Sequence, residues 1–384
     1  MARHKVTKTS TQGYGSRIAG SFKGILAGLG IFIASFVLLW WNEGRAVTRT
    51  KALDEGAAVV IEVSADKVDP DNEGKLIHVS GLITSEDTVK DLDFGIVSNQ
   101  LKLNRKVEMY QWVEESTSKT DKNLGGSETT TTEYTYTKQW SSSLKNSADF
   151  EEPNGHQNPG GFPVEPSRMQ VSSGKLGDFD VKYELIEGLG GGTPISLDPA
   201  SVICPSNGKV TSNHIYIGRG TSSSPQIGDV KVSFEELKEG VYSIIGKQVG
   251  NSFDDYQTEN NSDLFLIESG SKSADSMIET AHSNNSKMTW ALRLAGFLMM
   301  MFGIRKVFKP IEVIADVIPL LGTILGAGIG LFAGVMAFLL SFLTIGIAWI
   351  RFRPILAFSL IGIGVAAFIL VYIRARKKKQ AASF

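Results

Sequence analysis

Residues 24–41 read GILAGLGIFIASFVLLWW, an uncharged, apolar run that ends in two tryptophans. About 20 consecutive apolar residues are enough for a helix to span the hydrocarbon core of a bilayer. No small-residue cleavage site follows the run, so it does not have the pattern of a secretory signal peptide. We therefore expect residues 24–41 to form a transmembrane helix.

Three more apolar stretches lie in the last quarter of the chain. Residues 290–304 are apolar apart from Arg293, and residues 317–350 and 354–373 are uncharged. None of them shows the polar face of an amphipathic core helix. The sequence therefore predicts further transmembrane helices at 290–308, 320–350 and 354–373, with an amphipathic cytoplasmic segment on the membrane surface at 309–319.

Charge divides the chain into the same parts. Residues 1–41 and 290–384 together hold 16 basic and 2 acidic groups, whereas residues 42–289 hold 23 basic and 38 acidic groups. This asymmetry excludes a simple soluble globule and a disordered chain. Basic residues favour the cytoplasmic side of a membrane. We therefore expect both basic tails, 1–23 and 374–384, in the cytoplasm and residues 42–289 outside it.

The acidic middle is long enough to form a domain with its own core. Alternating apolar and polar residues, as in Val230–Phe234, predict β-strands with one wet face. The polar stretch 116–132 between two predicted strands is expected to be mobile, and the proline- and glycine-rich stretch 153–166 to separate two lobes. The predicted fold is a membrane protein with four transmembrane α-helices and a large α+β, β-rich extracytoplasmic domain inserted between helices 1 and 2.

Several short motifs, taken in chain order, resemble one family. They are NEGRA at 42–46, NEGKLIH at 72–78, VEMYQWVE at 107–114, GHQNP at 155–159, GDVKVSF at 228–234 and MTWALR at 288–293. This series resembles the transmembrane protein 43 family, also called LUMA, over nearly the whole chain. The resemblance implies four spans, a luminal or periplasmic domain between the first two, and no catalytic motif.

The same resemblance suggests two locations. Animal members of the family are proteins of the endoplasmic reticulum and inner nuclear membrane, with scaffold roles toward other envelope proteins and a tendency to self-associate; bacterial members also exist. The lean domain and short polar tails of this chain favour a bacterial inner membrane, with the endoplasmic reticulum or nuclear envelope as the expectation for a eukaryotic chain.

Glycines recur at every fourth position in two predicted spans. The first set is Gly20, Gly24 and Gly28, and the second is Gly322, Gly326, Gly330 and Gly334. This spacing places the missing side chains on one face, where another helix backbone can approach closely. We expect these glycines to pack helices within the bundle, with contact between subunits as the alternative.

Aromatic and basic residues mark the predicted membrane surfaces. Those expected at the outer interface are Trp40, Trp41, Trp290, Arg293, Trp349, Arg351 and Arg353. Arg293 lies inside a predicted span, where snorkelling is the favoured way to accommodate its charge and pairing is the alternative. Arg351 and Arg353 oppose the charge rule and contact either outer-leaflet phosphates or the acidic domain. On the cytoplasmic side, Arg305, Lys306 and Lys309 are candidates for contact with an anionic lipid headgroup.

The domain itself offers little catalytic chemistry. Its histidines lack metal-binding spacing, so no metal or cofactor is predicted. The single Cys204 predicts a buried thiol, and His156, in a loop near acids, a solvated side chain. Tyr134, Tyr136 and Trp140 share one face of a predicted strand and form either a partner surface or part of the domain's core. The basic ends are too short for nucleic-acid modules.

These features predict a non-enzymatic multi-pass membrane scaffold that organises membrane-protein complexes. Its expected partners are membrane lipids, other membrane proteins and further copies of itself as a homo-oligomer, with no nucleic acid. A lipid-binding or lipid-sensing protein is the alternative. A channel or transporter would need polar residues along its spans, which have almost none after Arg293, so it ranks lower.

Overall fold

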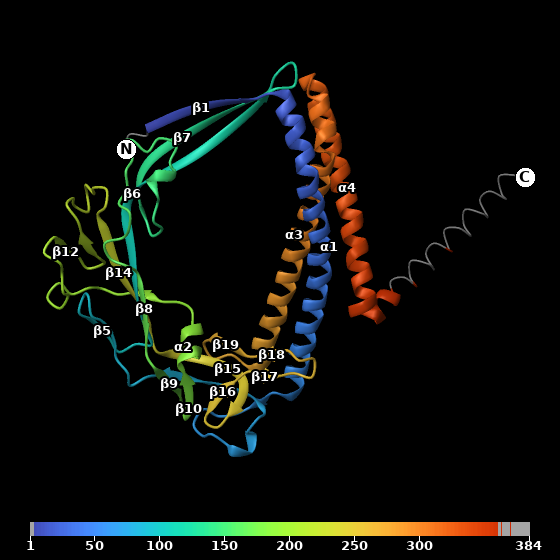
Figure 1. The fold of residues 1–384 in the computed structure, drawn as a ribbon. Coiled ribbons are helices and arrows are strands. Elements are labelled where there is room, and N and C mark those ends of the chain that lie inside the picture. The colour runs from blue at the N-terminus through green and yellow to red at the C-terminus, as the bar shows by residue number, and fades with distance from the viewer. Residues whose placement is uncertain (1–3, 360–361, 363–368, 370–384) are drawn as a thin grey trace, which may run out of the picture. The chain divides into compact units, whose positions relative to one another are not determined.

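The computed structural model describes residues 4–359 together with residues 362 and 369 (Figure 1). The chain forms two compact units. The β unit consists of Met1–Ser10, Glu55–Thr120 and Thr130–Ile278, and the helical unit of Thr11–Asp54, Asp121–Thr129 and Glu279–Phe384. Most of the predicted helix 354–373 and all of the tail 374–384 lie outside the described residues.

Three long helices supply most of the helical unit: α1 (Tyr14–Val59), α3 (Ala274–Ala315) and α4 (Pro319–Phe352). Among the described residues, α1 and α4 are long and apolar enough to cross a membrane, by length and composition. α3 contains the predicted span 290–308 but does not meet the same test. The structure thus supports two of the four predicted spans as candidates. Buried Leu39, Met300 and Ala333 form part of one apolar core in this unit.

The predicted surface segment 309–319 is not a separate element. α3 continues through Pro310 to Ala315, and α4 begins at Pro319. Proline suits the first turn of a helix because its missing amide would have no partner there. Only residues 316–318 therefore separate the two helices.

The β unit contains two larger sheets and two isolated strand pairs. Its strands are β1 (His4–Gln12), β2 (Ile61–Glu62), β3 (Leu76–Thr84), β4 (Val89–Asp91), β5 (Ile96–Ser98), β6 (Lys102–Lys122), β7 (Glu128–Ser141), β8 (Ser167–Gln170), β9 (Ser173–Leu176), β10 (Phe179–Lys182), β11 (Thr193–Pro194), β12 (Gly208–Val210), β13 (Ile215–Ile217), β14 (Val230–Leu237), β15 (Gly240–Val249), β16 (Ser252–Asp254), β17 (Tyr256–Gln257), β18 (Asp263–Leu264) and β19 (Leu266–Ser269). The short helix α2 (Tyr183–Gly188) follows β10.

Strand order defines the two sheets. The eight-stranded sheet runs β1-β7-β6-β14-β13-β12, with β8 paired to β6 and β11 to β14. The seven-stranded sheet runs β19-β15-β16-β10-β9-β3-β2, and β15 also pairs with β3. The pairs β4–β5 and β17–β18 stand apart. The domain is therefore β-dominated, as predicted.

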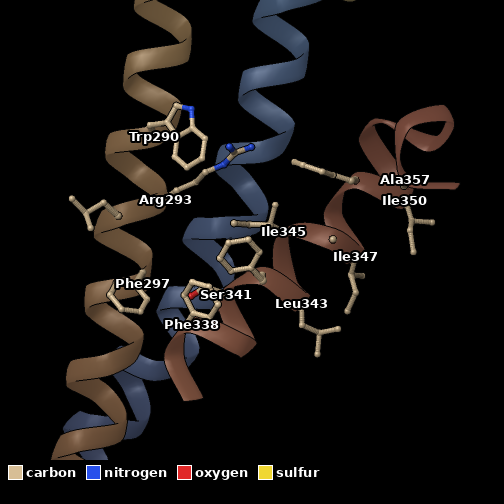
Figure 2. A pocket seen from close by; sticks show the side chains of 14 residues that line it. Trp290, Arg293, Phe297, Phe338, Ser341, Leu343, Ile345, Ile347, Ile350 and Ala357 are labelled. Carbon is tan, nitrogen blue, oxygen red and sulfur yellow. The ribbon is translucent and has the colours of Figure 1, made fainter. Parts of the chain in front are cut away.

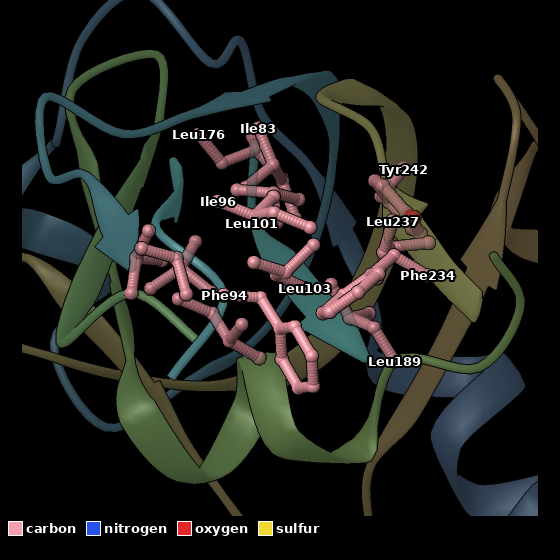
Figure 3. Packing of buried hydrophobic residues seen from close by; sticks show 14 of the residues in the cluster. Ile83, Phe94, Ile96, Leu101, Leu103, Leu176, Leu189, Phe234, Leu237 and Tyr242 are labelled. Carbon is pink, nitrogen blue, oxygen red and sulfur yellow. The ribbon is translucent and has the colours of Figure 1, made fainter. Parts of the chain in front are cut away.

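One apolar core contains side chains of both sheets (Figure 3). Ile83 and Leu176 come from the seven-stranded sheet, and Leu103 and Phe234 from the eight-stranded sheet; all four are almost fully buried. β14 alternates buried and more exposed residues, as its sequence predicts. Burying one such side chain contributes about 1.5–3 kcal/mol, so the core holds the two sheets together.

The chain does not divide at the predicted lobe boundary, 153–166. Residues 130–278 belong to one compact unit. Phe162 and Val164, inside the proline- and glycine-rich stretch, pack against the core of that unit. The stretch is therefore a loop over a continuous core.

Residues 4–10 belong to the β unit. β1 is a strand of the eight-stranded sheet, next to β7. Lys5 and Lys8 pair with Glu133 (2.7 Å) and Glu151 (2.6 Å). Paired strands lie less than about 5 Å apart, so β1 is an integral part of this sheet. The two lysines are bound to carboxylates of the same unit, Glu133 on β7 and Glu151 in a loop. The cytoplasmic location of residues 1–23 remains a prediction.

Candidate functional site

A buried ion pair joins α1 to α3. The Glu43 carboxylate has no exposed surface and accepts hydrogen bonds from Arg293 Nε (2.6 Å), Arg293 Nη2 (2.9 Å) and Trp349 Nε1 (2.8 Å). The guanidinium also lies 4.8 Å from the centre of the Trp290 ring, on the same helix (Figure 2). Bidentate contact with a carboxylate is among the strongest geometries open to arginine. The prediction that Arg293 snorkels is therefore wrong, and pairing is correct.

A ladder of polar contacts continues from this pair along α1 and α3. Asn42 Nδ2 donates to Thr289 O (3.0 Å), and Arg45 donates to Asn285 Oδ1 (3.0 Å) and Thr289 Oγ1 (3.0 Å). Asn285 Nδ2 donates in turn to Ala46 O (3.0 Å). Residues four apart share one face of a helix, so Asn285, Thr289 and Arg293 form a continuous polar stripe along α3. The stripe fixes the register of α3 against α1.

Two glycines bring the same helices into close contact. A Cβ on Gly28 would lie 2.8 Å from Lys306 Cβ and 3.0 Å from Gly303 O. A Cβ on Gly303 would lie 2.8 Å from Phe32 N. Side chains at either position would push the backbones apart. The sequence pattern identified Gly28 but missed Gly303, which belongs to no glycine repeat.

Four other predicted glycines show no such packing. A Cβ on Gly20, Gly24 or Gly330 would meet no described atom within 4 Å, and one on Gly334 would meet Met301 Sδ at 3.9 Å. Their role in helix packing remains a prediction, in the form of contact between subunits.

A second cluster of charges surrounds the connection between α3 and α4. Lys122 Nζ lies 2.7 Å from Asp316 Oδ1 and 3.0 Å from Glu312 Oε1, and Arg17 also pairs with Asp316. Lys309 Nζ lies 2.9 Å from Glu312 Oε1. Asp316 is fully buried, and Glu312 almost so. Burying these charges requires such partners, since an unpaired ion in an apolar medium is costly.

Gly322 and Gly326 make room for the two carboxylates. A Cβ on Gly322 would overlap Asp316, and one on Gly326 would lie 2.8 Å from Glu312 Cδ. These two glycines, predicted to pack against another helix, therefore face acidic side chains near the start of α4. Burial alone would raise the pKa of Asp316 and of Glu312. Hydrogen bonds from Lys122 and Arg17 outweigh burial at Asp316, and those from Lys309 and Lys122 outweigh it at Glu312, so both pKa values are lowered.

Lys122, the last residue of β6, belongs to the segment 121–129 that leads from β6 into β7. This segment lies within 116–132, the stretch predicted to be mobile, and it makes defined contacts, including a hydrogen bond from Gly125 N to Val317 O (3.1 Å). The sequence placed 42–289 outside the cytoplasm and 309–319 within it, and both assignments remain predictions.

The predicted lipid-contact residues differ in their surroundings. Arg305 is exposed, and the half-buried Lys306 places Nζ 5.2 Å from the centre of the Phe302 ring. Lys309 is engaged with Glu312. Of the three, only Arg305 is both exposed and free of ion pairs with the described side chains. Lipid contact there remains a prediction.

The predicted interface residues are mostly accessible. Trp41 and Trp290 are exposed, and Trp40 is exposed on one side while its ring lies 5.5 Å from that of Phe352. Arg351 is exposed and Arg353 half-buried. Their contact with phosphates or with the acidic domain remains a prediction.

The predicted aromatic partner surface is only partly exposed. Tyr136 is fully buried, its hydroxyl donates to Glu114 Oε2 (2.6 Å), and its ring stacks on His156 at 3.9 Å. Burial, followed by the hydrogen bond to Glu114, raises the pKa of Tyr136 to about 12. Tyr136 is thus a core residue, and only the half-buried Tyr134 and Trp140 remain candidates for a partner surface.

His156 and Cys204 were predicted to be solvated and buried, respectively. His156 is instead buried, with Nδ1 2.8 Å from Glu152 O and its ring against Trp112. Cys204 is half-buried. Among the described residues no group of three His, Cys, Asp or Glu side chains is placed to hold a metal ion.

Comparison with known proteins agrees with the motifs in the sequence. The family model of transmembrane protein 43 matches residues 109–354. Transmembrane protein 43 of Rattus norvegicus is 30% identical over 98% of this chain and 96% of its own length, and that of Homo sapiens is 29% identical over the same shares. The homolog of Drosophila melanogaster is 30% identical over 90% of this chain and 93% of its own length. No solved structure matches. The chain therefore belongs to the transmembrane protein 43 family.

Proposed function

We propose that this protein is a non-enzymatic multi-pass membrane scaffold that organises membrane-protein complexes. The observation that carries the proposal is that the buried charges of the helical unit pair with one another. Glu43 and Arg293 neutralise each other between α1 and α3, and Asp316 is paired with Arg17 and Lys122. These charges hold helices in register instead of lining a path or converging on a substrate.

The outer surface of the helical unit supports embedding in a membrane. Leu26, Ile33 and Val37 of α1 are more than half exposed, as are Leu331 and Phe342 of α4. Soluble proteins rarely expose so much contiguous apolar surface. Lipid tails, or apolar helices of partner proteins, would cover these faces.

Strand pairing supports one arrangement of the chain at the membrane. Because β1, before α1, and β7 and β6, after it, pair in one sheet, we propose that both ends of α1 face one compartment and that α1 makes no net crossing. α4 and the predicted helix 354–373 would then supply the crossings of a multi-pass protein. The relatives compared above are animal proteins, which supports the endoplasmic reticulum or nuclear envelope over the bacterial inner membrane favoured by the sequence.

A mass measurement tests the scaffold. The full chain is reconstituted in nanodiscs, and intact complexes are weighed by native mass spectrometry. We expect multiples of 41.6 kDa, or one chain with a stoichiometric membrane-protein partner. Glu43→Gln should reduce assembly, because it weakens the α1–α3 register, whereas Glu279→Gln, an exposed carboxylate on α3, should not. A lone chain under all conditions would contradict the proposal.

One observation favours the alternative, a lipid-binding protein. A groove of about 780 Å³ lies between α3 and α4, lined almost entirely by apolar side chains such as Phe297, Phe338 and Leu343 (Figure 2). Lipid acyl chains have the length and polarity that such a groove accommodates.

The groove can be filled without disturbing its walls. Gly346 lines it, and a Cβ there would meet no described atom within 4 Å. Gly346→Leu should therefore reduce the lipid that co-purifies with the protein, measured by mass spectrometry of extracts. Gly330→Leu, equally unhindered but outside the groove, is the control. Equal lipid content in both variants would speak against this function.

A further inference from the structure

A polar groove of about 1140 Å³ lies within the β unit. Its floor is one face of the paired strands β8, β6 and β14. Lys102 of β6 is opposite Gln170 of β8, and Asn104 is opposite Arg168. Directly opposed residues in antiparallel strands project from the same face of a sheet. Register alone thus brings these four side chains to one surface.

Lys102 lies at the base of this groove. Its side chain is about nine-tenths buried, and Nζ donates to Glu187 O (2.8 Å) and Leu189 O (2.7 Å) at the end of α2. A lysine ammonium has three donors, so one remains for a ligand. Burial lowers the pKa of Lys102; Glu187 opposes that shift, and the nearby positive charge of Arg168 adds to it. The lysine therefore lacks a full counter-charge in the free chain.

The rim of the groove supplies further donors. Arg168 is exposed and lines the groove, and it forms no ion pair with the described residues. The loop Gly188–Gly191 also lines the groove. The amides of Gly190 and Gly191 donate to no other described group, and a Cβ on Gly190 would meet open space. Exposed glycine amides beside cations are a recurrent way of binding anions.

Most other charges of the lining are matched or stand apart. Lys106 pairs with Glu235, and Arg105 with Asp91 and Asp93. Glu108 also lines the groove, six residues along β6 from Lys102 and so at the other end of the floor. Glu187 lines the groove near Lys102. Lys102 and Arg168 carry two positive charges against the one negative charge of Glu187, so this end of the groove is positive.

We propose that this end of the groove binds a compact anion, a phosphate or carboxylate group, between Lys102, Arg168 and the amides of Gly190 and Gly191. The site lies in the β unit and is independent of the scaffold role. Arg168 supplies a planar pair of donors that suits either anion, and the glycine backbone approaches it without hindrance. Tyr183, half exposed at the wall, would contact the rest of the ligand.

Binding of inorganic phosphate to the full-length protein in detergent tests the site, for example by titration calorimetry. Arg168→Gln should weaken binding about tenfold or more, since a charge-assisted hydrogen bond is lost. Lys209→Gln removes an exposed charge elsewhere in the β unit and should leave affinity unchanged. Lys102→Gln is a poor test because it also removes two contacts to the end of α2. Gly190→Pro removes one amide donor and serves as the second variant; it should also weaken phosphate binding.

Vesicles distinguish the source of the anion. If phosphatidic acid vesicles displace phosphate from the wild-type chain but not phosphatidylcholine vesicles, the natural ligand is a lipid headgroup; if neither displaces it, the ligand is a free anion. No saturable binding of phosphate, or of acetate as the carboxylate probe, would overturn the proposal. Equal binding by the Arg168→Gln and Lys209→Gln variants would overturn it as well.

Discussion

Replacing Arg293 by methionine should destabilise the helical unit strongly. The substitution keeps an apolar stem of similar length but leaves the Glu43 carboxylate, which has no exposed surface, with only the Trp349 indole as a donor. Removing one partner of a buried ion pair costs about 3–5 kcal/mol. The double variant Glu43→Met with Arg293→Met removes both charges, and such replacements are often neutral. It should therefore be more stable than Arg293→Met alone.

The free energy of unfolding in mixed micelles, measured by titration with a denaturing detergent, provides the comparison. A loss of 3 kcal/mol corresponds to a change of about a hundredfold in the unfolding equilibrium. Lys287→Met, which removes an exposed positive charge from the same helix, controls for net charge. If Arg293→Met cost less than about 1 kcal/mol, as is usual for a surface pair, or if the double variant lost as much as the two single variants together, the ion pair would not hold the helices in register.

Two further predictions concern the charge cluster at the α3–α4 connection. Gly322→Ala should cost about 1–3 kcal/mol because its Cβ overlaps Asp316, whereas Gly330→Ala should be tolerated; equal thermal stability of the two variants would show that the glycine makes no room for the carboxylate. The pKa values of Asp316 and Glu312 are held below their usual 3.8 and 4.5, so these groups stabilise the fold above those values and the contribution is lost as pH falls through the lower folded-state pKa values. Thermal unfolding should therefore show an acid-dependent loss that is smaller in Asp316→Asn, and identical pH profiles would refute the role of Asp316. Tyr136→Phe should lower stability by about 1 kcal/mol through loss of the hydrogen bond to Glu114 without changing partner binding; a binding defect at unchanged stability would return Tyr136 to the partner surface.

The sequence predicted the elements whose signals are local. The apolar run 24–41 lies within α1, and the alternation of Val230–Phe234 forms β14 with one buried face. Such patterns reflect the periodicity of one helix or strand, and that periodicity does not depend on distant residues. For the same reason the β-rich character of residues 42–289 was predictable.

The contacts that define the site come from residues far apart in the chain. Glu43 and Arg293 are separated by 250 positions, and nothing local marks one as the partner of the other. Lys5, Lys8 and Arg17 were counted as topological charges, yet each pairs with a carboxylate. Charge composition cannot separate a lysine that faces a membrane from one that faces a glutamate on the neighbouring strand.

The proposed topology requires that the N-terminal strand and the rest of the β unit share one compartment. In a Cys204→Ser chain, single cysteines are introduced at exposed positions by Thr9→Cys in β1 and Leu92→Cys in the β4–β5 turn. Sealed vesicles of one orientation are then treated with a membrane-impermeant maleimide, before and after permeabilisation. Both cysteines should react from the same side of the membrane. Reaction of the two from opposite sides would contradict the proposed topology.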